Sequence, residues 1–324
     1  MNCSRPLSIL NPCNTSEELN LYNSLAVVRE RILVPCGKCY ACLVNRQRSW
    51  VYRMAAQMEV DKWPAYFFTL TYTDDNIPKT SKGEETLVKS DLQAFMKRFR
   101  SNVDYHCDKN GLDHWSCQFY ACGEYGTQTQ RPHYHVLVFN CPPWIADYLH
   151  SLIKKSWKLS DLEPQLIMVT DLKLVFYITK YISKINQQKL HLRDEDKIKY
   201  YLHNSLLSGA REMAEKLMTD VYQEKPFALM SRRPAIGKSY YDKLSQNQKQ
   251  FFLDSPVVHI AGLSFSLPRY YRQKIFDAYE RSELLENSIQ NLENQTPYQQ
   301  RQNVAKNIVK ERMAAYKEKR NNLF

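Results

Sequence analysis

The chain has 324 residues, a formal net charge of +11 at neutral pH and 22 tyrosines. No run of about eighteen apolar residues is present, which excludes a transmembrane helix, and the first residues lack the basic and apolar regions of a signal peptide. Nine cysteines favour free or metal-bound thiols in a reducing cytoplasm over a disulfide framework. A basic, aromatic-rich chain is typical of a protein that binds a polyanion, most often nucleic acid.

Three cysteines lie close together near the amino terminus. Cys36, Cys39 and Cys42 follow one another at three-residue steps, the spacing of zinc-binding knuckles. Zinc takes four ligands, so a distant thiol is needed, and Cys3 is the first candidate for this structural zinc site. Packed free thiols are the alternative, while the third cysteine argues against a redox-active pair. Residues 45–60 follow as a basic, amphipathic helix.

Strands and helices alternate through the middle of the chain. Aromatic and β-branched runs predict strands at residues 66–72, 117–124, 132–139 and 166–170. Helical spacing of apolar residues predicts helices at residues 91–100, 144–157, 174–185 and 200–218. This order indicates an α+β fold with helices packed on a central antiparallel sheet.

We expect four parts along the chain. They are a cysteine-cluster segment and basic helix at 1–60, a catalytic core at 61–190, a basic accessory region completing that domain at 191–270, and a polar helical tail at 271–324.

One predicted strand carries two histidines two positions apart. Side chains alternate along a strand, so His133 and His135 share a face and Tyr134 points to the other. Antiparallel pairing with the preceding strand would bring Glu124 near both histidines. Two imidazoles and one carboxylate, with positions left open, are the ligands of a catalytic metal site. An isolated surface histidine pair is the alternative.

The helix predicted at 174–185 has two distinct faces. Four residues fall within one arc of about 100°: Tyr177, Lys180, Tyr181 and Lys184. Ile178 and Ile182 lie on another arc, which can pack on the sheet. The tyrosines are either packing residues or nucleophiles. A tyrosine that attacks a phosphodiester keeps the broken strand attached, and lysines and a cation stabilise the charge that develops.

Together these motifs resemble the HUH (His–hydrophobic–His) endonucleases, in particular the replication initiators of gokushovirus-like microviruses, which are small single-stranded DNA bacteriophages. The resemblance spans roughly residues 1 to 240. It rests on Phe68-Thr69-Leu70-Thr71-Tyr72, on Glu124 with Arg131-Pro132-His133-Tyr134-His135, on Tyr177-x-x-Lys180-Tyr181-x-x-Lys184, on the four cysteines, and on residues 230–237.

The resemblance implies a sheet-based core of the ferredoxin or RRM type, a catalytic Mg²⁺ or Mn²⁺, and nicking of replicative DNA at the phage origin. It also implies a 5′-phosphotyrosine link and a free 3′ hydroxyl that primes rolling-circle synthesis by the host polymerase. Gly237-Lys238-Ser239 lacks the earlier glycine of a phosphate-binding loop, because position 232 is arginine. We therefore expect a separate host helicase to unwind the DNA.

Six basic residues are predicted to contact DNA phosphates: Lys97, Arg98, Arg131, Arg232, Arg233 and Lys238. Two other functions stay open at this point. A plasmid relaxase or single-strand transposase uses the same metal motif, and a non-catalytic zinc-dependent DNA-binding protein would use the histidines and cysteines structurally.

Overall fold

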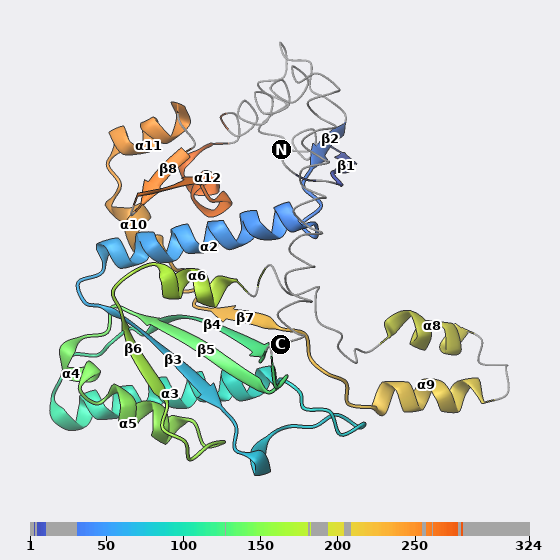
Figure 1. The fold of residues 1–324 in the computed structure, drawn as a ribbon. Coiled ribbons are helices and arrows are strands. Elements are labelled where there is room, and N and C mark those ends of the chain that lie inside the picture. Colours follow the sequence, from blue (N-terminus) through green and yellow to red (C-terminus); the bar gives the residue numbers. More distant parts are fainter. Residues whose placement is uncertain are drawn as a thin grey trace. The chain divides into compact units, whose positions relative to one another are not determined.

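The fold is described from a computed structural model of the chain (Figure 1). The structure describes residues 3, 5–10, 31–126, 128–180, 182, 194–203, 209–254, 257–260, 262–277 and 280. Two compact units are present, one formed by Asp61–Ile236 and the other by Met1–Val60 with Gly237–Phe324.

A five-stranded antiparallel sheet, in the order β6-β3-β5-β4-β7, forms the centre of the unit Asp61–Ile236. Its strands are β3 (Ala65–Thr71), β4 (Gln118–Tyr125), β5 (Pro132–Phe139), β6 (Gln165–Val169) and β7 (Phe227–Met230). The predicted α+β fold with a central antiparallel sheet is confirmed. β7 was not predicted as a strand, and it is held at the sheet edge by pairing with β4.

Helices cover both faces of this sheet. They are η2 (Asp74–Asn76), α3 (Lys89–Asn110), α4 (Pro143–Ala146), α5 (Leu149–Ser156), α6 (Lys173–Thr179), α8 (Glu195–His203) and α9 (Ala210–Thr219). α3 and α5 lie on one face and α6 on the other (Figure 1). The helix predicted at 144–157 is in fact two helices, α4 and α5, separated at Asp147 and Tyr148.

The second unit is built around one long helix. Its elements are β1 (Leu7–Leu10), β2 (Arg31–Val34), α2 (Tyr40–Val60), α10 (Lys238–Lys243), α11 (Gln246–Asp254), β8 (Val257–Ile260), β9 (Leu263–Ser266) and α12 (Arg269–Ile275). Tyr52 of α2 is fully buried, with its ring 5.6 Å from that of Tyr271 and 5.7 Å from that of Phe265. Most of the predicted polar tail lies outside the described residues. Among the described helices, none has the length and apolar character that crossing a bilayer requires.

The sheet face under α3 and α5 holds the main apolar core. Tyr134 and Val136 of β5 point into it beside Phe68 of β3, and all three are fully buried. The Tyr134 ring lies 5.7 Å from the Trp157 ring, and the Phe68 ring lies 6.0 Å from that of Phe95 on α3. Because Tyr134 faces this core, His133 and His135 point to the opposite face, as the alternation predicted.

The hydroxyl of Tyr134 ties β5 to the start of α3. It accepts a hydrogen bond from the Val88 amide at 2.9 Å and lies 2.6 Å from the hydroxyl of Tyr72. Tyr72 in turn donates to the Asp91 carboxylate at 2.7 Å. Burial raises the pKa of Tyr72 and of Tyr134 above the ordinary range, so both phenols stay neutral. This network fixes the strand that carries the two histidines against α3.

We predict that Tyr134→Phe lowers the free energy of unfolding by about 1–3 kcal/mol, because it leaves buried partners without a hydrogen bond. Tyr66→Phe is the matched control. Tyr66 packs on the same sheet face, and its hydroxyl has no hydrogen bond among the described residues, so the cost should stay below about 0.5 kcal/mol. Urea unfolding followed by tryptophan fluorescence measures both, and equal costs would contradict the role of the hydroxyl.

Candidate metal centre

β4 and β5 place a carboxylate and two imidazoles on the sheet face opposite the apolar core. Glu124 lies directly across from His133 in the antiparallel register. Its Oε1 is 2.8 Å from His133 Nε2 and 2.7 Å from His135 Nε2. The three ligand atoms lie within 4.8 Å of one another. The structure thus brings together the three residues that the sequence indicated as metal ligands.

The second nitrogen of each imidazole is held by a neighbouring segment. His133 Nδ1 lies 3.1 Å from the carbonyl oxygen of Arg131, which can only accept, so Nδ1 carries a proton and donates it. His135 Nδ1 lies 2.9 Å from Thr69 Oγ1, on the β3 residue opposite His135 in register. Anchoring Nδ1 and presenting Nε2 is the usual arrangement of metal-binding histidines. The role of Thr69 was missed from the sequence, because it depends on the pairing of β3 with β5.

The chemistry of the three side chains fits a bound cation. A neutral His133 with its proton on Nδ1 turns a lone pair toward Glu124 Oε1, and two acceptors at 2.8 Å repel each other. Glu124 is 2% exposed, and its Oε2 has no hydrogen-bond partner among the described residues. A buried carboxylate in this position is stabilised by a positive ion between the oxygen and the two nitrogens.

The ionisation of these groups agrees with that fit. Burial acts to raise the pKa of Glu124, but the hydrogen bonds and charges of His133 and His135 outweigh it and hold the pKa below its ordinary value. Burial also lowers the pKa of His135, although Glu124 acts in the opposite direction. The group is therefore suited to an ionised carboxylate beside neutral His135, the protonation states in which both bind metal.

α6 brings a tyrosine to the same face of the sheet. The hydroxyl of Tyr177 lies 3.3 Å from His135 Nε2, and its side chain remains partly exposed. The Lys180 ammonium lies 3.6 Å from the centroid of the Tyr177 ring. On the other side of α6, Ile178 and Ile182 are buried beside sheet residues, as the helical spacing predicted.

Tyr177 is a neutral phenol in these surroundings. Burial, followed by the Glu124 carboxylate and Cys122, raises the pKa of Tyr177 to about 12. A divalent cation at Glu124 would neutralise that carboxylate and remove its share of the rise. The predicted partners Tyr181 and Lys184 lie outside the described residues.

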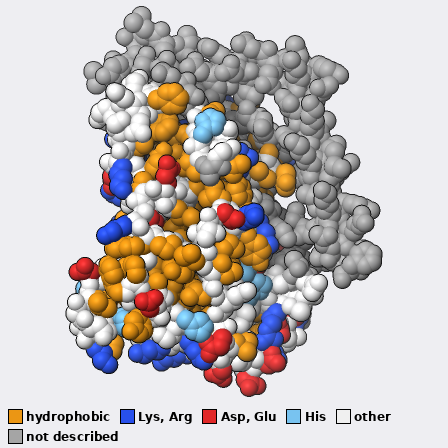
Figure 2. All heavy atoms as spheres, turned by 60° about the vertical axis from the view of Figure 1, so that its left-hand side comes forward, with side chains coloured by type: hydrophobic (Ala, Val, Ile, Leu, Met, Phe, Trp, Pro, Cys, Tyr) orange, Lys and Arg blue, Asp and Glu red, His pale blue; other side chains and the backbone are white. Residues whose placement is uncertain are grey.

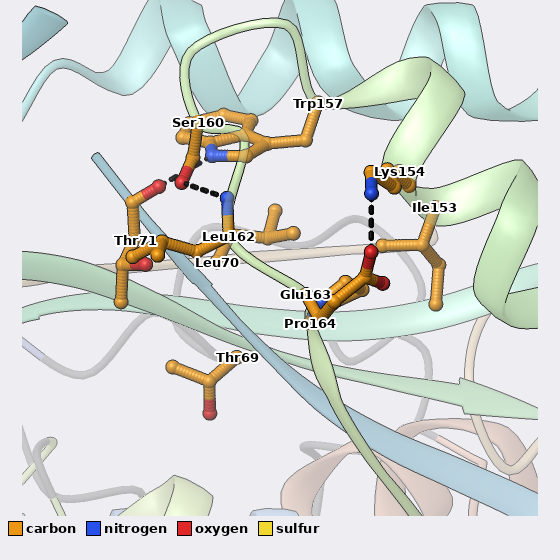
Figure 3. A pocket seen from close by; sticks show the side chains of 10 residues that line it. All are labelled: Thr69, Leu70, Thr71, Ile153, Lys154, Trp157, Ser160, Leu162, Glu163 and Pro164. Carbon is orange, nitrogen blue, oxygen red and sulfur yellow. Dashed lines mark hydrogen bonds and ion pairs between the residues drawn. The ribbon is translucent and has the colours of Figure 1, made fainter. Parts of the chain in front are cut away.

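The loop after α5 supports the end of β3 (Figure 3). Trp157 Nε1 donates to the Thr71 carbonyl at 2.6 Å, and the Leu162 amide donates to Ser160 Oγ at 3.1 Å. Lys154 and Glu163 form an ion pair across the same pocket. Because Thr69 on this strand contacts His135, the loop also helps to hold the metal ligands in place.

Arg131 is engaged by its own neighbours. Its guanidinium contacts the Asp74 carboxylate at 2.6 Å and the Tyr72 carbonyl at 2.8 Å, and its carbonyl holds His133. The side chain therefore braces the ends of β3 and β5. Its predicted contact with phosphate stays a prediction.

The other predicted DNA contacts are distributed over several elements. Lys97 and Arg98 lie on α3, on the sheet face opposite the metal ligands, and Arg98 donates to the Ser156 carbonyl at 2.8 Å. Arg232 and Arg233 are exposed after β7, and Lys238 pairs with Asp242 in the second unit. Figure 2 shows basic side chains spread over the face that it draws, with acidic and apolar side chains between them.

Comparison with known proteins identifies relatives of this chain. A family model that describes replication-associated proteins of the ORF2 type matches residues 65–186, which run from β3 through α6 and include the candidate metal ligands. No solved structure matches the chain.

Three phage and virus proteins are similar in sequence. Replication-associated protein VP4 of Bdellovibrio phage phiMH2K is 26% identical over 286 residues, which cover 84% of this chain and 76% of that protein. Replication-associated protein ORF2 of Spiroplasma virus 4 is 30% identical over 44% of this chain and 45% of its own length. Replication-associated protein ORF4 of Chlamydia phage 1 is 26% identical over 47% of this chain and 38% of its own length. The predicted resemblance to the replication proteins of gokushovirus-like phages is thereby confirmed.

Proposed function

We propose that this protein initiates rolling-circle replication in the host cytoplasm by nicking one strand at the phage origin. The observation that carries the proposal is the position of the Tyr177 hydroxyl, 3.3 Å from His135 Nε2, beside the Glu124 carboxylate and His133. A nucleophile next to a candidate metal centre is the arrangement that a metal-assisted phosphodiester cleavage needs. The similarity to replication-associated proteins supports the same conclusion.

Glu124, His133 and His135 would hold Mg²⁺ or Mn²⁺. When bound, the ion neutralises charge on the scissile phosphate and orients it for in-line attack. The protein supplies the fixed positions of the ligands through Thr69 Oγ1 and the Arg131 carbonyl. It also supplies a ready nucleophile on α6, a helix whose other side is buried against the sheet.

The tyrosine oxygen attacks phosphorus, and the bond from phosphorus to the 3′ oxygen breaks. The 3′ oxygen takes up a proton and leaves as a hydroxyl that primes synthesis by the host polymerase, while a separate helicase unwinds the duplex. The new phosphotyrosine bond retains the energy needed to rejoin the strand. Lys180, next to the Tyr177 ring, stabilises the phenolate and the negative charge of the transition state. Tyr181 would then serve the second strand transfer.

Removing a metal ligand should stop cleavage while leaving most DNA binding intact. We expect His133→Ala and His135→Ala to reduce nicking of supercoiled origin DNA to background, and EDTA to do the same to the unaltered protein. DNA affinity should change little, because it comes mainly from phosphate contacts. The matched control is His114→Ala, since the His114 side chain is exposed and pairs with Asp104 and Asp108 of α3. Wild-type nicking by either ligand variant would exclude this metal assignment.

Removing the hydroxyl that anchors His135 should weaken metal binding without removing a ligand. We expect Thr69→Val to raise the metal concentration needed for half-maximal nicking by about 10–100-fold, the usual effect of losing such an anchor. Thr71→Val is the control, because Thr71 lies on the same strand face and its hydroxyl has no hydrogen bond among the described residues. A metal titration of both variants provides the measurement. An unchanged titration for Thr69→Val would mean that Thr69 does not position His135.

The tyrosines can be tested by trapping the covalent product. Either Tyr177→Phe or Tyr181→Phe should block complete rolling-circle turnover, because the second attack needs a second nucleophile. The double variant should form no covalent adduct with a single-stranded origin oligonucleotide. Tyr105→Phe is the control, since Tyr105 is 60% exposed on α3. Peptide mapping of any adduct that persists in the double variant would identify a different nucleophile and rule out this mechanism.

A further inference from the structure

Four cysteine sulfurs converge in the second unit, apart from the residues of the proposed nicking reaction. The sulfurs of Cys3, Cys36, Cys39 and Cys42 all lie within 4.8 Å of one another, and those of Cys3 and Cys39 are 3.8 Å apart. A zinc–sulfur bond of about 2.3 Å gives a tetrahedral site with sulfurs about 3.8 Å apart. A disulfide requires about 2.05 Å instead, so these two thiols are not bonded to each other.

Backbone amides point at the sulfurs. The Cys36 amide donates to Cys3 Sγ at 3.3 Å, and the Cys39 amide donates to Cys36 Sγ at 3.3 Å. The turn that allows this contains Gly37, whose φ of +71° favours glycine. Hydrogen bonds from amides stabilise a thiolate more than a neutral thiol, and those from Lys38 and Cys39 lower the pKa of Cys36. The turn is therefore arranged for metal-binding thiolates.

Apolar packing does not account for this cluster. Its buried members are Cys3, Cys39 and Cys42, and only Cys36 and Ala41 pack against them among the described residues. The adjoining hairpin of β1 and β2 has only two strands, and every residue of β1 is exposed. A two-stranded hairpin is marginal in water, and a small segment without an apolar core usually depends on a metal or a disulfide.

We propose that Cys3, Cys36, Cys39 and Cys42 bind one zinc ion in a closed, structural site. Four protein thiolates complete the tetrahedral coordination, so no position is left for a substrate. Clusters of several iron atoms hold their cysteines farther apart than a single ion does, and the short distance between the sulfurs of Cys3 and Cys39 favours one ion. The ion would join residue 3 to the start of α2 and close the loop that contains β1 and β2.

The test measures metal in the full-length protein after dialysis against EDTA. We expect about one zinc per chain, held by thiolates as structural zinc is. The double variant His133→Ala/His135→Ala should keep that zinc, because it alters only the nicking centre. Cys39→Ser should lose it, whereas Cys117→Ala should keep it, since Cys117 is a buried thiol outside the cluster.

A second measurement covers the case in which Cys39→Ser fails to fold. Zinc release from the unaltered protein should follow titration with a thiol-specific mercurial reagent, and refolding with Co²⁺ should give the visible bands of tetrahedral cobalt with sulfur-to-metal charge transfer. Zinc lost in the double histidine variant, or no zinc and no cobalt–thiolate spectrum in the unaltered protein, would overturn the proposal. Neither result bears on nicking, which is assayed separately with DNA.

Discussion

The carboxylate of Glu124 is buried between two imidazoles, and the rest of the catalytic unit is organised so that this arrangement can exist. Its Oε1 lies 2.7–2.8 Å from both Nε2 atoms, while its Oε2 has no hydrogen bond within the described structure. Burying a charge without compensation is costly, so the strands, loops and helix around it must present positive or proton-donating groups. A cation bound by Glu124, His133 and His135 satisfies that requirement and provides a reason for keeping a charged group inside the protein.

β5 serves stability on one face and chemistry on the other. Tyr134 is fully buried and tied through its hydroxyl to Val88 and Tyr72, whereas His133 and His135 point away from that core. Rigid packing under the strand limits its movement, so the imidazoles cannot drift relative to Glu124 on β4. A metal site needs this precision, because ligand positions must hold to within a few tenths of an ångström.

The nucleophile and the metal ligands come from different layers of the fold. Tyr177 lies on α6, and the buried side chains of Ile178 and Ile182 hold that helix against the sheet. The phenol is kept protonated by burial and by the nearby carboxylate, which raise its pKa to about 12. Binding of a cation would weaken the second effect, so activation of the tyrosine would be linked to occupancy of the metal site.

Local sequence patterns determined the parts of this protein that depend on one element alone. Alternation along a strand placed both histidines on one face, and helical spacing separated Tyr177 from Ile178 and Ile182. Antiparallel folding of two neighbouring strands also brought Glu124 to them. Contacts between distant segments were decided only in the tertiary structure: Thr69 meets His135 across 66 positions, and β7 joins β4 across about a hundred residues of chain. Strand register over such separations follows from packing and ladder pairing, which no local pattern records.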